Sequence, residues 1–251
     1  MRYAILSDIH SNLEAFTAVI DSLASERIDR YLCLGDIIGY GADPVACLER
    51  LQTCDAVTVA GNHEMACVGK LDLGWFHEAA RIALAWTRDQ LGFIELDYLR
   101  RLPLVTTHAP FTLVHASLRR PERFDYLLDV AQAIDALRAC RTTICLSGHT
   151  HQPCVLEYDR AAHRLIRFIT RAEELQDVPI TTADETRCVL INPGSVGQPR
   201  DGDPRAGVAL IDTERNRLWV RRVAYDIATA QRKIRQAGLP EFFAERLSLG
   251  R

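Results

Sequence analysis

Polar side chains that can bind metal ions follow a series of short apolar segments along the chain. They are carboxylates, imidazoles and one amide: Asp8, His10, Asp36, Asn62, His63, His115, His149 and His151. The protein has eight histidines, and five of them are in this set. Mixed carboxylate and imidazole ligands suit Mn²⁺, Fe or Zn²⁺ better than Ca²⁺, which prefers oxygen ligands. We therefore expect these residues to form a metal centre.

The number and spacing of the candidates indicate two ions rather than one. Asp8 and His10 are separated by one residue, as are His149 and His151, so each pair lies on one side of an extended loop. Without His63, seven candidate ligands remain, too many for one ion but suited to two ions that share a carboxylate. Two ions about 3.5–4 Å apart can clamp an in-line displacement at phosphorus. Each motif alone is common in turns and caps, so the interpretation rests on their ordered combination.

The first 64 residues predict alternating strands and helices. Strands are expected at 3–6, 31–34 and 56–59, and helices at 13–23 and 44–51. This β-α-β-α-β order implies a parallel sheet with right-handed crossovers. Each group of candidate ligands comes just after a strand, and ligand sites of α/β sheets gather at the carboxyl ends of strands.

The rest of the chain is richer in strands. Further strands are expected at 111–114, 143–146, 155–158, 164–168, 188–191, 207–211 and 218–220, with a helix at 130–140. Residues 171–187 are polar and predict an exposed loop. The expected fold is α/β with α+β character, in which two stacked mixed β-sheets form a sandwich flanked by helices. We expect residues 1–251 to form one domain. The helical segment 75–101 is either part of the core or a cap over the site.

Composition excludes several classes of protein. The chain has 251 residues, of which 48% are hydrophobic and 25% charged, and its net charge is −3. This is typical of a globular protein and argues against a disordered chain or a strongly basic nucleic-acid coat. The N-terminal apolar run ends at Asp8, too early for a signal peptide, and no stretch is apolar enough to span a membrane. Eight cysteines without a CxxC pair suit buried thiols in a reducing cytosol, so we expect a cytoplasmic protein without a membrane partner. The oligomeric state stays open.

The ordered motifs resemble those of the calcineurin-like metallophosphoesterases. The matching residues are Asp8-Ile9-His10, Gly35-Asp36, Gly61-Asn62-His63-Glu64, His115 and Gly148-His149-Thr150-His151. The resemblance covers roughly residues 1–200. The segment Asn192–Arg200 is similar to a loop of small prokaryotic members regarded as predicted phosphodiesterases. The family fold is a pair of stacked mixed sheets flanked by helices, in agreement with the fold expected from the residues.

The resemblance implies a role for each candidate. Asp8, His10 and His151 would hold the first metal, and Asn62, His115 and His149 the second, with Asp36 bridging both. The cofactors would be two divalent transition-metal ions, with manganese expected and iron, zinc, cobalt or nickel as alternatives. A metal-bridging hydroxide would attack phosphorus in line. His63 would be the catalytic histidine, either a general acid or a stabiliser of phosphoryl charge.

Two positions depart from the family pattern. Gly39 replaces an aspartate that orients the catalytic histidine in some branches, and Tyr40 replaces a phosphate-binding arginine. These changes argue against protein-phosphatase activity, and they leave His63 without an evident orienting partner. We expect substrate contacts from Arg200 and Arg119 instead, because a guanidinium suits phosphate. We also expect one from Tyr40, whose ring can stack on a base or an aryl group. For each arginine the alternative is a solvated surface side chain, as it is for Arg120 and Arg123.

The sequence therefore favours a dinuclear-metal-dependent phosphoesterase that acts on a small phosphodiester, or on a phosphomonoester. One alternative is a non-catalytic metal-binding scaffold of the same fold, which typically loses a ligand, whereas every position is filled here. Another is a nuclease, which the nearly neutral charge disfavours, so we do not expect a nucleic-acid partner. A solvated helical face explains the basic residues of 221–251 as well as a partner does.

Overall fold

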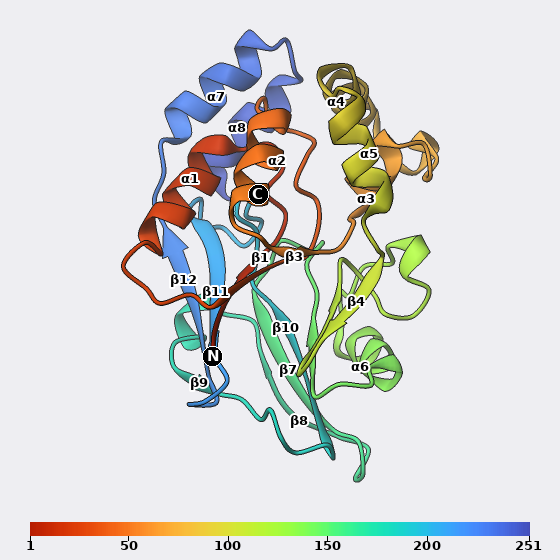
Figure 1. The fold of residues 1–251 in the computed structure, drawn as a ribbon, viewed down its shortest axis with the longest axis vertical. Helices are drawn as coiled ribbons and strands as arrows, with labels where there is room; N and C mark the ends of the chain where they lie inside the picture. Colours follow the sequence, from red (N-terminus) through yellow and green to blue (C-terminus); the bar gives the residue numbers. More distant parts are fainter.

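A computed structural model describes residues 1–251 as two mixed six-stranded sheets with helices around them (Figure 1). The first sheet has the order β3 (Val57–Thr58), β2 (Arg30–Cys33), β1 (Arg2–Leu6), β11 (Ala206–Asp212), β12 (Arg217–Val223) and β9 (Val178–Pro179). The second has the order β4 (Val105–His108), β5 (Phe111–Val114), β6 (Ile144–Leu146), β10 (Arg187–Asn192), β7 (Cys154–Asp159) and β8 (Arg164–Ile169). The predicted sandwich of two mixed sheets is confirmed.

The strand pairing explains why both sheets are mixed. β1, β2 and β3 are parallel to one another, as the β-α-β-α-β order predicts, and β11 joins β1 in the antiparallel sense. In the second sheet β5, β6 and β10 are parallel, whereas the predicted hairpin of β7 and β8 is antiparallel. The carboxyl ends of the parallel strands carry the loops in which the candidate ligands lie.

Alternate residues of β1 belong to two different cores. Tyr3 and Ile5 pack in the cluster between the sheets, where residues of β5 such as Phe111 come from the other side. Ala4 and Leu6 point the other way, against the helices that cover the first sheet. Both faces of β1 are therefore buried, and its sequence reads as a continuous apolar run.

Eight α-helices surround the sheets. They are α1 (Leu13–Ser22), α2 (Pro44–Thr53), α3 (Asn62–Cys67), α4 (Glu78–Gln90), α5 (Phe93–Arg101), α6 (Val130–Ala139), α7 (Ile227–Gln236) and α8 (Glu241–Leu249). Figure 1 shows α1, α2, α7 and α8 together at the upper left, α3 to α5 at the upper right, and α6 beside the second sheet. None of the helices has the length and apolar character that crossing a bilayer requires.

Some sequence expectations need correction. The segment 171–187 is not simply an exposed loop, because Leu175, Val178 and Ile180 are buried in the core between the sheets. The strand β4 was not predicted. The helical segment 75–101 is divided, since the backbone at Gly92 is extended and caps a new helix, α5. The basic C-terminal residues are largely paired, for example Arg221 with Glu26 at 2.6 Å.

The loop 192–198 ties the two sheets together behind the candidate site. Its N–H groups at Val196 and Gly197 donate to the carbonyl oxygens of Ser7 and Asp8, both at 2.9 Å. A Cβ atom on Gly197 would lie 1.8 Å from the carbonyl oxygen of Ile9. Because that atom is backbone, no side-chain movement can make room, and only glycine fits.

We therefore predict that Gly197→Ala pushes the Asp8–His10 segment out of place. The unfolding free energy should fall by about 1–3 kcal/mol, the usual cost of overpacking, and metal binding should weaken in parallel. Thermal denaturation and metal analysis of the purified variant measure both effects. Gly74→Ala is the control, since its Cβ would meet only an Asp72 side-chain oxygen at 3.2 Å. A Gly197→Ala protein with normal stability and metal content would contradict the prediction.

Candidate metal centre

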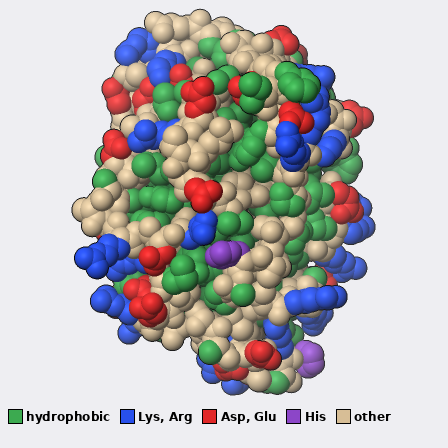
Figure 2. Space-filling model, viewed as in Figure 1, with side chains coloured by type: hydrophobic (Ala, Val, Ile, Leu, Met, Phe, Trp, Pro, Cys, Tyr) green, Lys and Arg blue, Asp and Glu red, His purple; other side chains and the backbone are tan.

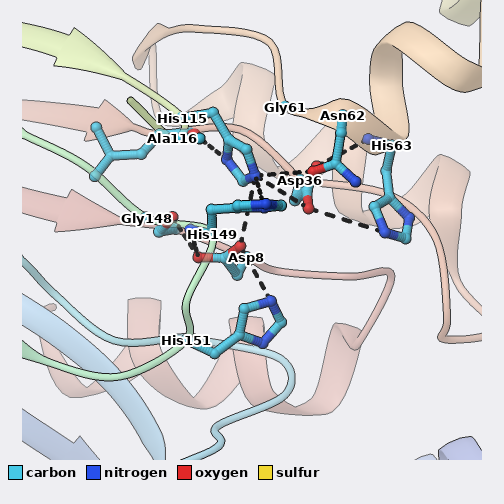
Figure 3. A network of polar contacts seen from close by, with 12 residues as sticks. Asp8, Asp36, Gly61, Asn62, His63, His115, Ala116, Gly148, His149 and His151 are labelled. Carbon is cyan, nitrogen blue, oxygen red and sulfur yellow. Dashed lines mark hydrogen bonds and ion pairs between the residues drawn. The ribbon is translucent and has the colours of Figure 1, made fainter. Parts of the chain in front are cut away.

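All seven predicted ligands and His63 are buried and lie in one cluster. Figure 3 labels His63 and every ligand except His10. Asp8 and His10 lie in the loop after β1, and Asp36 in the loop after β2. His115 follows β5, and His149 and His151 follow β6. Asn62 and His63 begin α3. The polar loops that follow strands distant in sequence thus meet at one place, as the order of the motifs predicted.

Within the cluster, the potential ligand atoms fall into three groups. Two of them are Asp8 with His10 and His151, and Asp36 with His115 and His149. The third is His10 with Asp36 and His63. In each group these atoms all lie within 4.8 Å of one another. The first group has the three residues that the resemblance implies for one ion, and the other two groups place Asp36 beside both His10 and His115. The division of the ligands between two ions stays a prediction.

Hydrogen bonds to the backbone fix the orientation of three imidazoles. The Nδ1 atoms of these rings contact carbonyl oxygens: His10 with Ile38 at 3.2 Å, His115 with Leu34 at 2.7 Å and His151 with Gln198 at 2.5 Å. Nδ1 must therefore be the protonated nitrogen, which leaves a lone pair on Nε2. The Nε2 atoms of His10 and His151 are 3.1 Å apart, and two lone pairs that face each other at this distance favour a positive charge between them, either a shared proton or a metal ion.

The carboxylate of Asp8 gives a second indication of a cation. Its Oδ2 accepts hydrogen bonds from the Ser7 hydroxyl at 2.6 Å and from the His149 N–H at 3.2 Å. Its Oδ1 is buried and has no hydrogen-bond partner. A buried oxygen that gives up water without a replacement costs free energy, and a metal ion removes that cost. The residues present thus fit the divalent cations that the donor set implies.

Burial sets the protonation of most of the histidines. It lowers the pKa of His149 to about 3 and that of His63 to about 4, so both rings are neutral at pH 7. For His115 the Asp36 carboxylate outweighs burial and raises the pKa to about 9 in the metal-free site. A neutral imidazole is the form that binds metal, so a cation would compete with a proton at His115.

Glu64 organises the centre without belonging to it. Its buried carboxylate accepts hydrogen bonds from the N–H groups of Asp36 at 2.8 Å, Ile37 at 2.8 Å, Ile38 at 3.2 Å and Gly61 at 2.7 Å. In the sequence, Glu64 is only the last residue of the motif Gly61-Asn62-His63-Glu64, to which no separate role was assigned. Its place three residues after Gly61, in a capping-box arrangement, is the local signal of a positioning role.

Packing, rather than a carboxylate, orients His63. Its ring lies 4.4 Å from that of Tyr40 and 5.4 Å from that of Phe76, both edge to face. Its Nδ1 is buried without a partner, and a Cβ on Gly39 would lie 2.1 Å from that atom. The space next to Nδ1 is therefore filled by the backbone of Gly39, and Tyr40 and Phe76 take over the orienting role.

The predicted substrate contacts lie at different places. The Arg200 guanidinium is 6.0 Å from the centre of the Tyr40 ring, and that ring is 4.4 Å from His10. Arg200 and Tyr40 are thus beside the metal centre. Arg119 instead pairs with Asp135 on an exposed surface, and its role in substrate binding stays a prediction.

Two neighbours of Arg119 differ in their position. Arg120 and Arg123 both lie near Asp125, at 4.0 and 3.5 Å. Arg123 also lines a cavity of about 140 Å³ that reaches Asn62 and His149. The same cavity is lined by residues 75–77. Only this end of the segment 75–101 therefore reaches the site, and its action as a cap stays a prediction.

Sequence reasoning missed Arg246 and Tyr126. Burial, together with the charge of Arg200, lowers the pKa of Arg246 to about 10. The Arg246 guanidinium lies 4.9 Å from the centre of the Phe242 ring. The Tyr126 ring stacks on His149 with a centroid distance of 3.9 Å. Both residues come from segments without a motif, so only the folded chain reveals them.

Comparisons with known proteins agree with this geometry. Residues 1–216 match the family model of the calcineurin-like phosphoesterase superfamily domain. The chain belongs to the calcineurin-like phosphoesterase superfamily. An uncharacterized protein of Methanocaldococcus jannaschii is 36% identical over 254 residues, which cover 99% of this chain and 98% of that protein.

Two solved structures show the same calcineurin-like fold along the entire chain. A metallophosphoesterase from Sphaerobacter thermophilus is 37% identical, with a TM-score of 0.86 and full coverage of both chains. A hypothetical protein from Pyrococcus horikoshii is 21% identical, with a TM-score of 0.76 over 100% of this chain and 98% of that one. The family model ends at residue 216, so α7 and α8 lie beyond it.

We predict that Glu64→Gln disrupts the centre although Glu64 binds no metal. The amide NH₂ would face backbone N–H groups and leave buried donors unsatisfied, which should cost about 2–4 kcal/mol of unfolding free energy. Metal content should fall as well. Urea denaturation and metal analysis test this, with Glu49→Gln on the exposed face of α2 as the control. Equal stabilities of the two variants would contradict the positioning role.

Gly39→Ala should displace His63 while the metal ligands stay in place. The added Cβ meets the His63 ring, and Gly39 has a φ of +90°, which a residue with a side chain rarely adopts. We expect metal content close to that of the unmodified protein and a different His63 ring position in a crystal structure or in NMR spectra. An unmoved His63 ring would show that the surrounding loop yields instead.

Proposed function

We propose that this protein hydrolyses a small phosphodiester, with phosphomonoesters as the second choice, at a centre that holds two divalent cations. The observation that carries the proposal is the pair of ligand groups around Asp36, buried at the meeting point of the strand ends. Membership of the phosphoesterase superfamily supports the same reaction class. Manganese is the metal that we expect, and the site's oxygen and nitrogen donors are compatible with it.

In this proposal the ligands divide between two ions. Asp8, His10 and His151 would hold the first, while Asn62, His115 and His149 would hold the second, and Asp36 would be a ligand of both. The two ions, when bound, lower the pKa of the attacking water and neutralise the phosphate oxygens.

The remaining work falls to residues beside the ligands. His63 directs its Nε2 toward the centre, 3.9 Å from Oδ2 of Asp36, and can hold a proton next to the leaving oxygen. Arg200 adds positive charge near Tyr40 at the edge of the centre. Because Tyr40 occupies the position where related phosphatases have an arginine, less positive charge faces the phosphate, which favours the singly charged diester over the doubly charged monoester.

The surface supports a small substrate rather than a nucleic acid. Figure 2 shows acidic and basic side chains interspersed over one face of the molecule, with hydrophobic side chains between them. The net charge of −3 agrees with this distribution. Sequence-independent binding of nucleic acid requires a basic surface, so we propose no such partner.

The test is hydrolysis of bis(4-nitrophenyl) phosphate and of 4-nitrophenyl phosphate by the Mn²⁺-loaded protein. We expect faster cleavage of the diester, and loss of activity after metal removal. His63→Ala should lower kcat by roughly 10²–10⁴-fold with unchanged metal content, the usual contribution of a positioned proton donor. Failure to cleave either ester with two metals bound would overturn the proposal in favour of a scaffold. Unchanged turnover of His63→Ala would remove only that residue from the mechanism.

A further inference from the structure

A second cavity lies directly beside the metal centre, on the side of the second sheet. It has a volume of about 440 Å³. The side chains that matter here are Tyr126, Leu128, Thr150, Gln152, Phe168 and Arg200. Cavities of this size accept a ring or a nucleoside-sized group. Thr150 lies within the motif Gly148–His151, but none of these side chains is a predicted metal ligand, and the ligand roles leave the cavity unassigned.

The cavity shares a wall with the centre. Thr150 stands between the ligands His149 and His151, and Tyr126 stacks on the His149 ring at 3.9 Å. The backbone N–H of Arg200 donates to the carbonyl oxygen of His151 at 3.3 Å. The cavity and the centre are therefore neighbours, joined by Thr150 and by the Tyr126 ring.

The lining combines apolar surface with a few polar groups. Tyr126, Leu128 and Phe168 leave 46%, 74% and 42% of their surface exposed, respectively. Exposed aromatic and aliphatic side chains that line one cavity next to a reactive centre indicate an apolar ligand. Thr150 and Gln152 add a hydroxyl and an amide that suit the polar edge of a ring.

The position of the cavity relative to His63 indicates which ester arm of the substrate it would hold. His63, the proposed neighbour of the leaving oxygen, lies on the opposite side of Asp36 from Gly148 and His149 (Figure 3). The cavity begins at Thr150, immediately after His149. It is therefore placed for the ester arm that stays on phosphorus, while the leaving group is on the His63 side.

We propose that this cavity binds an aromatic ring on the retained ester arm, so that the substrates are phosphodiesters with an aryl or nucleobase-bearing arm. The inference rests on the proposed function, because it concerns a substrate of the same centre. Tyr126 and Phe168 provide the aromatic walls, and Arg200 stands at the boundary between the ring and the phosphate. An alkyl arm of similar charge would leave these walls in contact with water.

The experiment compares two diesters with the same leaving group. Bis(4-nitrophenyl) phosphate and methyl 4-nitrophenyl phosphate both release 4-nitrophenolate, and they differ only in the arm that stays. We expect Phe168→Ala to reduce kcat/KM for the bis-aryl ester by roughly tenfold, mainly through KM, the size expected for losing an aromatic wall. For the methyl ester the same variant should change kcat/KM less than about twofold.

Leu165→Ala is the matched control, because Leu165 is an exposed residue of the same strand, β8, and does not line the cavity. It should leave both substrates unaffected. Equal effects of Phe168→Ala on the two esters, or no effect on either, would overturn the inference while hydrolysis itself upholds the proposed function. If the unmodified protein cleaves neither ester, the result contradicts the proposed function, and with it the inference about the retained arm.

Discussion

The site depends on one buried carboxylate that four backbone N–H groups surround. Glu64 accepts three of them from the loop that follows β2 and the fourth from Gly61. Two loops that carry ligands are thereby fixed to the same charged group. A second link joins these loops, because the Asp36 side chain accepts a hydrogen bond from the backbone N–H of His63 at 3.0 Å. Burial and the Asp36 carboxylate raise the pKa of Glu64 to about 7. Both disfavour the ionised carboxylate, and the hydrogen bonds from the backbone donors stabilise it.

Backbone strain is concentrated at the ligands. Five of the seven have positive φ angles, namely Asp8 at 54°, His10 at 49°, Asp36 at 51°, His149 at 66° and His151 at 60°. Each such residue costs on the order of 1 kcal/mol and persists only where the surroundings determine its conformation. The surroundings leave these loops no space to change conformation. A Cβ on Gly61 would lie about 2 Å from a side-chain oxygen of Asp36, and a Cβ on Gly148 about 2 Å from the hydroxyl oxygen of Ser7. The loops are thus held in conformations that aim side chains inward.

The ligand set could be predicted because each motif follows a strand, and strand ends meet at one edge of a parallel sheet. The helical spacing of apolar residues predicted α1, whose start is set by Asn12 accepting the N–H of Ala15. Other features carry no local signal. The burial of Leu175 and Ile180 depends on a sheet edge that forms only in the folded chain. The position of Tyr126 against His149 depends on the path of an irregular loop, which periodicity does not describe.

The replacement of an aspartate and an arginine by Gly39 and Tyr40 changes how the site is held together. A carboxylate would orient His63 by a hydrogen bond, whereas here its ring is held by aromatic edges. Tyr40 also stacks on Phe243 of α8 at 4.6 Å, and Phe243 is fully buried. The helix pair beyond residue 216 therefore supports the Tyr40 ring from behind, and through it the orientation of His63. Aromatic packing requires that a second surface cover the ring, so the C-terminal helices take part in holding the Tyr40 and His63 side chains in place.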